Sequence, residues 1–469
     1  MPTGSDAHHL RAGVAAGHPA TTAAGYAALR AGGSAADAAI AATLAACVAE
    51  TVFTGLGGGG FATYWSAAEQ RATCLDFFVT VPGLDTSATP APMSRLQIRF
   101  GGVEQAYSVG ASSVAVPGIP AGCGELHARW GRLPWERLVT PALRLASAGV
   151  PLSIAHARVL RALEDGLLIG DGALAYAPDG ELLGAGERLH HPGLDQALRL
   201  LADEGADTFY TGPLAKAIVH AVHDGGGVLS PEDLSSYAVM ELPAETAGLG
   251  RYTVHARRDL NDTLSAFAAL PADLEALTAG ERAVAVTRSL GGPEQHGDTT
   301  NVTAVDADGN ACVVTTTLGL GAGVWLPGYG VHLNSMLGEG ELLRGQPRPG
   351  ERMSSMMCPL VVTDEHGLAL AAGAAGASRI RTALVHSVVG VLIEGRTPAE
   401  AVAWPRIHPV AGLAHVEPGV PADEVDALVA AGYRIRQWDA YDHYFGGASL
   451  IGRAGAGADP RRGGAVRLL

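Results

Sequence analysis

Lysine is almost absent from this sequence: Lys216 is the only one among 469 residues, so arginine carries nearly all the positive charge. Chemistry that needs a lysine Schiff base is therefore excluded everywhere except at Lys216. The formal net charge of -15 leaves no excess of positive charge either. Because a nucleic-acid binder presents a positive face to the phosphates, we expect no nucleic-acid partner.

Cysteine is scarce too, and its residues are scattered without any Cys-x-x-Cys pair. The five are Cys47, Cys74, Cys123, Cys312 and Cys358. An odd, dispersed set predicts small buried side chains in a reducing compartment rather than a disulfide framework or a zinc site. For Cys123 a buried structural thiol is favoured over a nucleophile, because nothing near it in the sequence lowers its pKa.

Metal-ligand spacing and long apolar runs are also missing. The pairs His8–His9 and His190–His191 do not share a helix face, so we expect surface or loop histidines, no metal and no cofactor. The alanine-rich stretch 38–49 lies between Asp37 and Glu50 and is too short to span a bilayer. Residues 1–16 lack the basic region and apolar core of a secretory signal. We expect a soluble cytoplasmic protein with no membrane partner.

What is present is a globular composition, with 48% apolar and 17% charged residues. The length allows two or three domains or one large two-layer unit. Residues 18–52 have a helical composition, broken at Gly32–Gly33 and restarted by a plausible helix cap at Ser34. Further expected elements are strands at 61–65 and 74–81 and helices at 138–148, 193–203 and 214–224.

The last third of the chain is rich in β-strand signals. Residues 301–305 and 311–318 flank the turn sequence 306–310, which predicts a hairpin. A second predicted hairpin joins residues 359–363 to 368–372, and an apolar helix at 380–394 is long enough to cover a sheet. The glycine-rich tail 452–464 is predicted to be loop.

The glycine block 55–60 formally matches Gly-x-Gly-x-x-Gly. A dinucleotide site needs a strand before this motif and a helix after it, whereas here a helix precedes and a strand follows. The glycines are better explained by the backbone passing close to something bulky, such as an active-site segment.

Residues 296–301, with the sequence His-Gly-Asp-Thr-Thr-Asn, allow two interpretations. One is a polar loop entering a strand, with threonines chosen for β-propensity. The other is a self-cleaving nucleophile at Thr299, because a threonine freed as a new N-terminus carries its nucleophile and base on one residue. An α-amino group with a pKa of about 7.7–8.0 suits a general base at neutral pH. Spacing alone does not decide between them.

Many short motifs in one order resemble the gamma-glutamyltransferase family over almost the whole chain. The motifs lie at residues 31–38, 54–61, 114–118, 131–135, 209–212, 298–300, 352–357, 445–447 and 458–462. The resemblance favours the nucleophile interpretation of Thr299. It implies an α+β fold, the αββα four-layer sandwich of the N-terminal-nucleophile hydrolases. It also implies autoproteolysis into a large subunit of residues 1–298 and a small subunit of residues 299–469, which form a heterodimer that can itself dimerise.

The resemblance also implies the roles of individual residues. Thr299 attacks an amide to form an acyl-enzyme, and Thr317 matches the second threonine, which hydrogen-bonds the nucleophile. Gly376 and Ala377 match the two backbone N–H donors of the oxyanion hole. A backbone donor does not depend on its side chain, so an alanine is acceptable there if it can adopt the required backbone conformation. Ser354 and Ser355 match the serine pair at the substrate carboxylate.

Departures from the family pattern concentrate where the substrate is recognised. Phe78 stands where an arginine clamps the γ-glutamyl carboxylate, and an aromatic ring cannot replace a bidentate guanidinium. Glu339 replaces an aspartate that grips the substrate amine, so recognition of a cation can survive. The other departures are Gly319 for asparagine, Met336 for glutamine, Asn301 for histidine, and a segment 257–269 without the usual prolines and serines.

These residues favour an autoprocessing threonine-nucleophile hydrolase or acyltransferase that acts on a small amide or peptide, as in glutathione metabolism. A related alternative is a pathway enzyme, in natural-product biosynthesis for instance, that cleaves a different amide or a carbon–carbon bond next to a carbonyl. From another class, a non-catalytic binding or assembly homologue is suggested by Phe78, Gly319 and Met336, whereas Thr299 and Thr317 argue against it.

Overall fold

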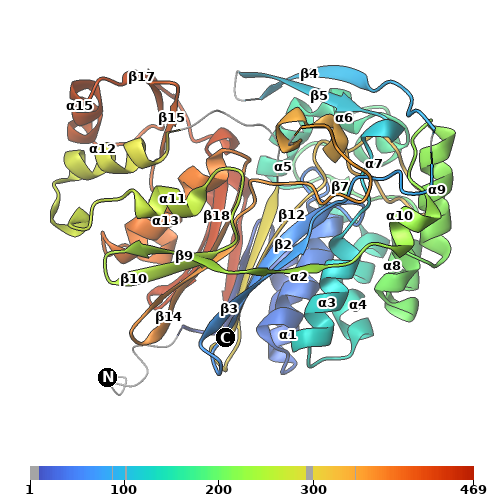
Figure 1. Ribbon diagram of the computed structural model, residues 1–469, viewed down its shortest axis with the longest axis horizontal. Coiled ribbons are helices and arrows are strands. Elements are labelled where there is room, and N and C mark those ends of the chain that lie inside the picture. Colours follow the sequence, from blue (N-terminus) through green and yellow to red (C-terminus); the bar gives the residue numbers. More distant parts are fainter. Residues whose placement is uncertain (1–9, 87, 101–102, 292–298, 344) are drawn as a thin grey trace.

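Two antiparallel sheets packed face to face form the centre of the molecule (Figure 1). The computed structural model describes residues 10–86, 88–100, 103–291, 299–343 and 345–469. Within these ranges the first sheet has seven strands, in the order β20 (Ala465–Leu468), β1 (Gly13–Ala16), β11 (Thr300–Val305), β12 (Ala311–Thr317), β2 (Gly59–Ser66), β3 (Arg71–Phe77) and β8 (Met240–Pro243). The second has six, in the order β19 (Gly455–Ala458), β18 (Gly447–Gly452), β14 (Gly367–Ala375), β13 (Leu360–Asp364), β10 (Tyr252–Ala256) and β9 (Glu245–Leu249).

Helices cover the outer face of each sheet. On the first sheet α2 (Ala35–Ala49) packs against β11 and β12, and every one of its residues is buried. On the second, α13 (Arg379–Leu392) packs against β14 and β18. The order helix, sheet, sheet, helix confirms the predicted αββα sandwich. The layers are completed by α1 (Pro19–Arg30), α3 (Ile119–Trp130), α4 (Trp135–Ala148), α8 (Leu194–Glu204), α9 (Pro213–Asp224), α11 (Thr263–Ala268) and α14 (Pro398–Ala403).

The interior between the sheets is apolar, with a few polar side chains that join the layers. Val313 of β12 and Val361 of β13 belong to one buried cluster. Asn301, the residue in place of the family histidine, is buried there and donates from Nδ2 to Val314 O at 3.1 Å. Gly373 makes this possible, since a Cβ atom on it would lie 1.8 Å from that nitrogen. Asn301 therefore bonds within the first sheet and packs against Gly373 of the second, whereas Thr303 of β11 joins the sheets by donating from Oγ1 to Ser449 O of β18 at 2.9 Å.

Most of the predicted elements are confirmed. Ser34 accepts a hydrogen bond from Asp37 N, and the Asp37 carboxylate accepts one from Ser34 N, so the predicted cap starts α2. The structure also has both predicted hairpins, the helix that follows the second one, and the three helices predicted in the middle third.

Two predictions of local structure are wrong. The tail 452–464 is not loop: it contains β19 and the 3-10 helix η8 (Pro460–Arg462). Glycine is used there because space is short, as a Cβ atom on Gly457 would lie 2.3 Å from Pro398 O. The strand predicted at 74–81 ends at Phe77, after which Thr80 forms only isolated bridges.

The remaining elements flank the sandwich (Figure 1). A small sheet of β15 (Ile407–Val410), β16 (Leu413–Val416) and β17 (Arg434–Gln437) lies with α12 (Ala279–Ser289) and α15 (Ala422–Ala430) beyond the second sheet. The helices of the described residues are all too short or too polar to cross a bilayer. The other elements are β4 (Ser94–Phe100), β5 (Val103–Val109), β6 (Val150–Pro151), β7 (Arg188–Leu189), α5 (Ile154–Ala162), α6 (Glu164–Leu167), α7 (Gly172–Tyr176) and α10 (Pro231–Ser235).

Candidate active site

Thr299 lies directly before β11, an inner strand of the first sheet, and only 5% of its surface is exposed. Its Oγ1 accepts a hydrogen bond from Gly376 N at 2.9 Å. Gly376 follows β14 of the opposite sheet, so the sandwich joins two residues that are 77 positions apart. His296 and Asp298 lie outside the described residues.

Ala377, the second expected donor of the oxyanion hole, has a φ of +52°. An L-residue in this left-handed region costs about 1–2 kcal/mol, so the surrounding structure must hold it there. Asn261 does so, because its Nδ2 donates to Ala377 O at 3.0 Å. Asn261 belongs to the segment 257–269, which lacks the prolines and serines that the family usually has there.

Thr317 ends β12, the strand that pairs with β11. Its Oγ1 accepts a hydrogen bond from Gly319 N at 2.9 Å. A Cβ atom on Gly58 would lie 2.2 Å from Thr317 O. The glycine block therefore lets the backbone pass close to Thr317, one of the candidate site residues.

Gly319 and Glu339 fit one another. Gly319 has a φ of +66°, and a Cβ atom on it would lie 2.4 Å from Glu339 Oε1 and 2.7 Å from Ser335 Oγ. Glu339 is buried, with 6% of its surface exposed. The longer carboxylate side chain thus occupies space that an asparagine at position 319 would need. These two departures from the family pattern compensate each other.

Phe78 is fully buried and does not present its ring to an open site. It stacks on Phe61 with 5.4 Å between the ring centroids, in one apolar cluster with Met336 and Met353. The Phe78 carbonyl accepts hydrogen bonds from Arg352 and from the Tyr237 hydroxyl. The position expected to clamp a carboxylate is part of the core.

The serine pair lies beside this cluster. Ser355 is buried, and its Oγ accepts from Met357 N at 3.2 Å, while its carbonyl accepts from Arg257. Ser354 is partly exposed and lines a small cavity of about 30 Å³ with Arg352 and Met353. That cavity is not lined by Thr299.

Two residues beside Thr299 were not identified from the sequence. Arg462 donates from a guanidinium nitrogen to Thr299 O at 3.2 Å. Glu50, which follows α2, accepts a hydrogen bond from the Thr300 hydroxyl and is 1% exposed. Burial raises the pKa of Glu50 to about 7, although hydrogen bonds from Thr21 and Thr300 and the charge of Arg462 lower it. In the sequence, Arg462 is marked only as the last residue of the family motif 458–462, and Glu50 only as the charged residue directly after the alanine-rich stretch 38–49.

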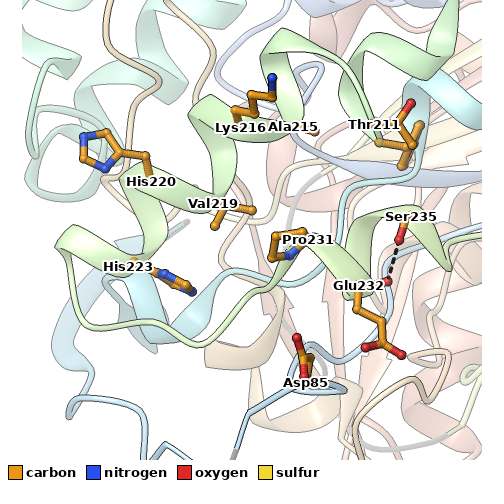
Figure 2. Close-up of a pocket in the computed structure, with 11 residues that line it drawn as sticks. Asp85, Thr211, Ala215, Lys216, Val219, His220, His223, Pro231, Glu232 and Ser235 are labelled. Carbon is orange, nitrogen blue, oxygen red and sulfur yellow. Dashed lines mark hydrogen bonds between the residues drawn. The ribbon is translucent and has the colours of Figure 1, made fainter.

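A cavity of about 820 Å³ lies elsewhere, between α9 and α10 (Figure 2). It is lined by Lys216, His220 and His223, which project from α9 in different directions (Figure 2). These side chains do not converge on one point, so Lys216 and the two histidines do not form a binding site together. None of the expected catalytic residues lines this cavity.

The remaining titratable groups have structural positions. All five cysteines are buried and free, and burial raises the pKa of Cys123 to about 12, which confirms a structural thiol. His191 lies in the loop between β7 and α8, in line with the expectation, and there it is buried, stacks on Trp325 and hydrogen-bonds Thr51. His190 is exposed, and His8–His9 lies outside the described residues. The described residues contain no cluster of metal ligands.

The four-layer architecture is that of the N-terminal-nucleophile hydrolases. The structure of cephalosporin acylase from Bacillus halodurans shares it, with a TM-score of 0.80 and 23% identity over 98% of this chain and 96% of that one. The chain belongs to the gamma-glutamyltranspeptidase family, whose model matches residues 21–258 and 272–469.

Named relatives agree with this assignment. The chain is 29% identical to Acylase ACY 1 proenzyme of Pseudomonas sp. (strain V22), over 83% of this chain and 81% of that protein. It is 24% identical to Glutathione hydrolase proenzyme of Bacillus subtilis (strain 168), over 83% and 79%. The chain is therefore an enzyme of this family, a hydrolase or acyltransferase of amides, and not a non-catalytic homologue.

Proposed function

We propose that the chain is an autoprocessing hydrolase or acyltransferase with Thr299 as its nucleophile. The contact between Thr299 Oγ1 and Gly376 N carries this proposal, because it places the hydroxyl beside a donor that stabilises a developing oxyanion. Both of the named relatives above are proenzymes, which supports maturation by cleavage.

Maturation breaks the peptide bond between Asp298 and Thr299. The Thr299 hydroxyl attacks the Asp298 carbonyl, the acyl group moves from nitrogen to oxygen, and water hydrolyses the ester. Chains 1–298 and 299–469 remain together as a heterodimer, since each of them contributes strands to both sheets. The product is a free α-amino group on Thr299.

In each turnover this amine takes the proton of the Thr299 hydroxyl as the oxygen attacks the substrate carbonyl. The N–H groups of Gly376 and Ala377 stabilise the tetrahedral oxyanion, and each such donor contributes about 10²–10³ in turnover. Collapse releases the amine of the substrate and leaves an acyl-enzyme. Water or a second amine then attacks the ester of the acyl-enzyme and frees the Thr299 hydroxyl. Attack by water is hydrolysis, and attack by an amine is acyl transfer.

The substrate is a small amide or peptide whose acyl part differs from a γ-glutamyl group. Phe78 supplies no guanidinium for an α-carboxylate, whereas the buried Glu339 carboxylate suits a cationic group. The same oxyanion donors would also serve cleavage of a carbon–carbon bond next to a carbonyl. Phe78 in place of the family arginine is compatible with this alternative, because such a substrate need not carry a γ-glutamyl carboxylate. Robust turnover of a γ-glutamyl anilide would contradict the rebuilt substrate site.

Intact mass tests the nucleophile directly. The purified wild-type protein should give two chains that meet at Asp298 and Thr299, whereas Thr299→Ala should stay a single chain of 47.8 kDa. The same variant should lose all amide turnover, because the attacking oxygen is gone. Thr211→Ala, at an exposed threonine, is the control and should be processed normally. A wild-type chain that never splits would refute the proposal.

A further inference from the structure

Glu50 lies beneath the strand end that carries Thr299. Its Oε1 accepts a hydrogen bond from Thr21 Oγ1 at 2.6 Å, and its Oε2 accepts one from Thr300 Oγ1. Gly17 leaves the space for this contact, since a Cβ atom on it would lie 2.5 Å from Glu50 Oε2 and 3.0 Å from Thr300 Oγ1. The carboxyl group is thus enclosed by three chain segments.

A carboxylate is costly at this place. Burial removes its hydration, and the C-terminal end of α2 carries the negative end of the helix dipole. After Asp37 the helix is a run of alanines and other small or apolar residues, so packing alone would favour an uncharged residue at position 50. The groups that Glu50 contacts therefore indicate its role.

Those groups hold the peptide unit between Thr299 and Thr300 from two sides. Arg462 donates to Thr299 O, and Glu50 accepts from the side chain of Thr300, the next residue. The positive charge of Arg462 also lowers the pKa of Glu50, so the two groups interact electrostatically. The Thr299 hydroxyl on the same peptide segment meets Gly376 N.

We propose that Glu50 is a positioning residue for Thr299. Its ionised carboxyl group holds the Thr300 hydroxyl, while Arg462 holds the Thr299 carbonyl, and together they fix the Thr299 hydroxyl against Gly376 N. This inference rests on the proposed role of Thr299 as the nucleophile.

The ionised form is the one that suits this role. A carboxylate accepts from both threonine hydroxyls, whereas a protonated carboxyl must donate one hydrogen, so one of the hydroxyls has to turn. Burial raises the pKa of Glu50 to about 7, so the change occurs near neutral pH. The titratable groups that face it are Arg462, from the tail after β19, and the Cys47 thiol of α2, whose own pKa burial raises.

The experiment compares Glu50→Gln and Thr300→Val with wild type. We measure the rate of self-cleavage by intact mass, and kcat and KM for an amide that the wild type turns over, from pH 5.5 to 9. Both variants should lower kcat about 10–100-fold with little change in KM, because the nucleophile is misplaced while substrate contacts remain. In wild type the acidic limb of the kcat–pH profile should reflect two ionisations, those of the Thr299 amine and the Glu50 carboxyl. In Glu50→Gln it should reflect that of the Thr299 amine alone. Thr300→Ser should recover most of the rate.

Thr22→Val is the matched control. Thr22 is a buried threonine of α1 next to Thr21, and its hydroxyl donates to His18 O and Ala465 O rather than to Glu50. If Thr22→Val slows the reaction as much as Thr300→Val does, the effect is general loosening and the proposal is overturned. Normal kcat and an unchanged acidic limb in Glu50→Gln also overturn it. If Glu50→Gln does not fold, Thr300→Val decides. A wild type that neither splits nor turns over an amide refutes the nucleophile itself, an outcome distinct from the other two.

Discussion

At the scale of single residues, the site is defined by compensation. The family pattern fails at Gly319 and at Glu339, yet the two changes match in volume, because the shorter residue makes room for the longer one. Ala377 likewise has a conformation that disfavours its own side chain and depends on Asn261 to hold it. A departure from a family motif is thus interpretable only together with the residue that it contacts.

Gly319→Asn tests this pairing. Although asparagine tolerates a positive φ, its side chain would overlap the Glu339 carboxylate, and overpacking of this kind costs about 1–3 kcal/mol. We expect a lowered Tm and much reduced amide turnover, measured by calorimetry and by initial rates. The double variant Gly319→Asn, Glu339→Asp should recover stability, because the shorter acid frees the space.

Gly328→Asn is the control for backbone conformation. Gly328 also has a positive φ, of +77°, but a Cβ atom on it would meet no atom within 4 Å. It should change the Tm little. An equal loss of stability in Gly328→Asn and Gly319→Asn would show that φ, and not space, sets the cost.

At the scale of elements, the chain after β19 is joined to the small sheet by buried ion pairs. Arg461 pairs with Glu417, which follows β16, and with Asp459 at 3.1 Å. Arg406 pairs with Asp459 and donates to Gly446 O, in the turn before β18. The network thereby fixes the segment that places Arg462 on Thr299.

Arg406→Met should disrupt this segment. Removal of one partner from a buried ion pair costs about 3–5 kcal/mol, because the remaining charge loses its compensation. We expect a strongly lowered Tm and slower self-cleavage, since Arg462 is no longer held in place. Arg434→Met, at an exposed arginine of β17, is the control and should behave as wild type. A normal Tm in Arg406→Met would show that the network does not stabilise the tail.

At the scale of the whole molecule, buried histidines set the response to acid. His156, His191 and His332 are buried, and burial lowers the pKa of each to about 3. The unfolded chain binds these protons near pH 6.5, so stability falls as the pH drops from there towards 3, by about 1.4 kcal/mol per pH unit for each histidine. Glu50 acts in the opposite direction, because its raised pKa costs stability as the pH rises through about 7.

Three histidines outweigh one carboxyl, so the Tm should be lower at pH 5.5 than at pH 7.5. In His191→Gln the difference between the two Tm values should shrink, even though the lost stacking on Trp325 lowers both. His220→Gln, at an exposed histidine of α9, should leave the difference unchanged. A difference that is the same in all three proteins would rule out His191 as a source of the acid response.

The sequence by itself determined the architecture and the family. Ser34, the two hairpin turns and the apolar helix after them are local signals, because caps, turns and periodicity act over a few residues. It did not determine the structure of the tail 452–464, because the glycine at position 457 allows close packing against Pro398 and does not mark a flexible loop.

Only the tertiary structure brought Thr299 to Gly376, seated Glu339 over Gly319, and placed Arg462 and Glu50 around the strand end. The partners in these contacts lie between 20 and 250 positions apart in the chain. Their proximity follows from the order of strands in two packed sheets, and no local pattern encodes that order. The physical reason is that local propensity selects the elements, whereas the burial of whole faces against each other selects which side chains meet.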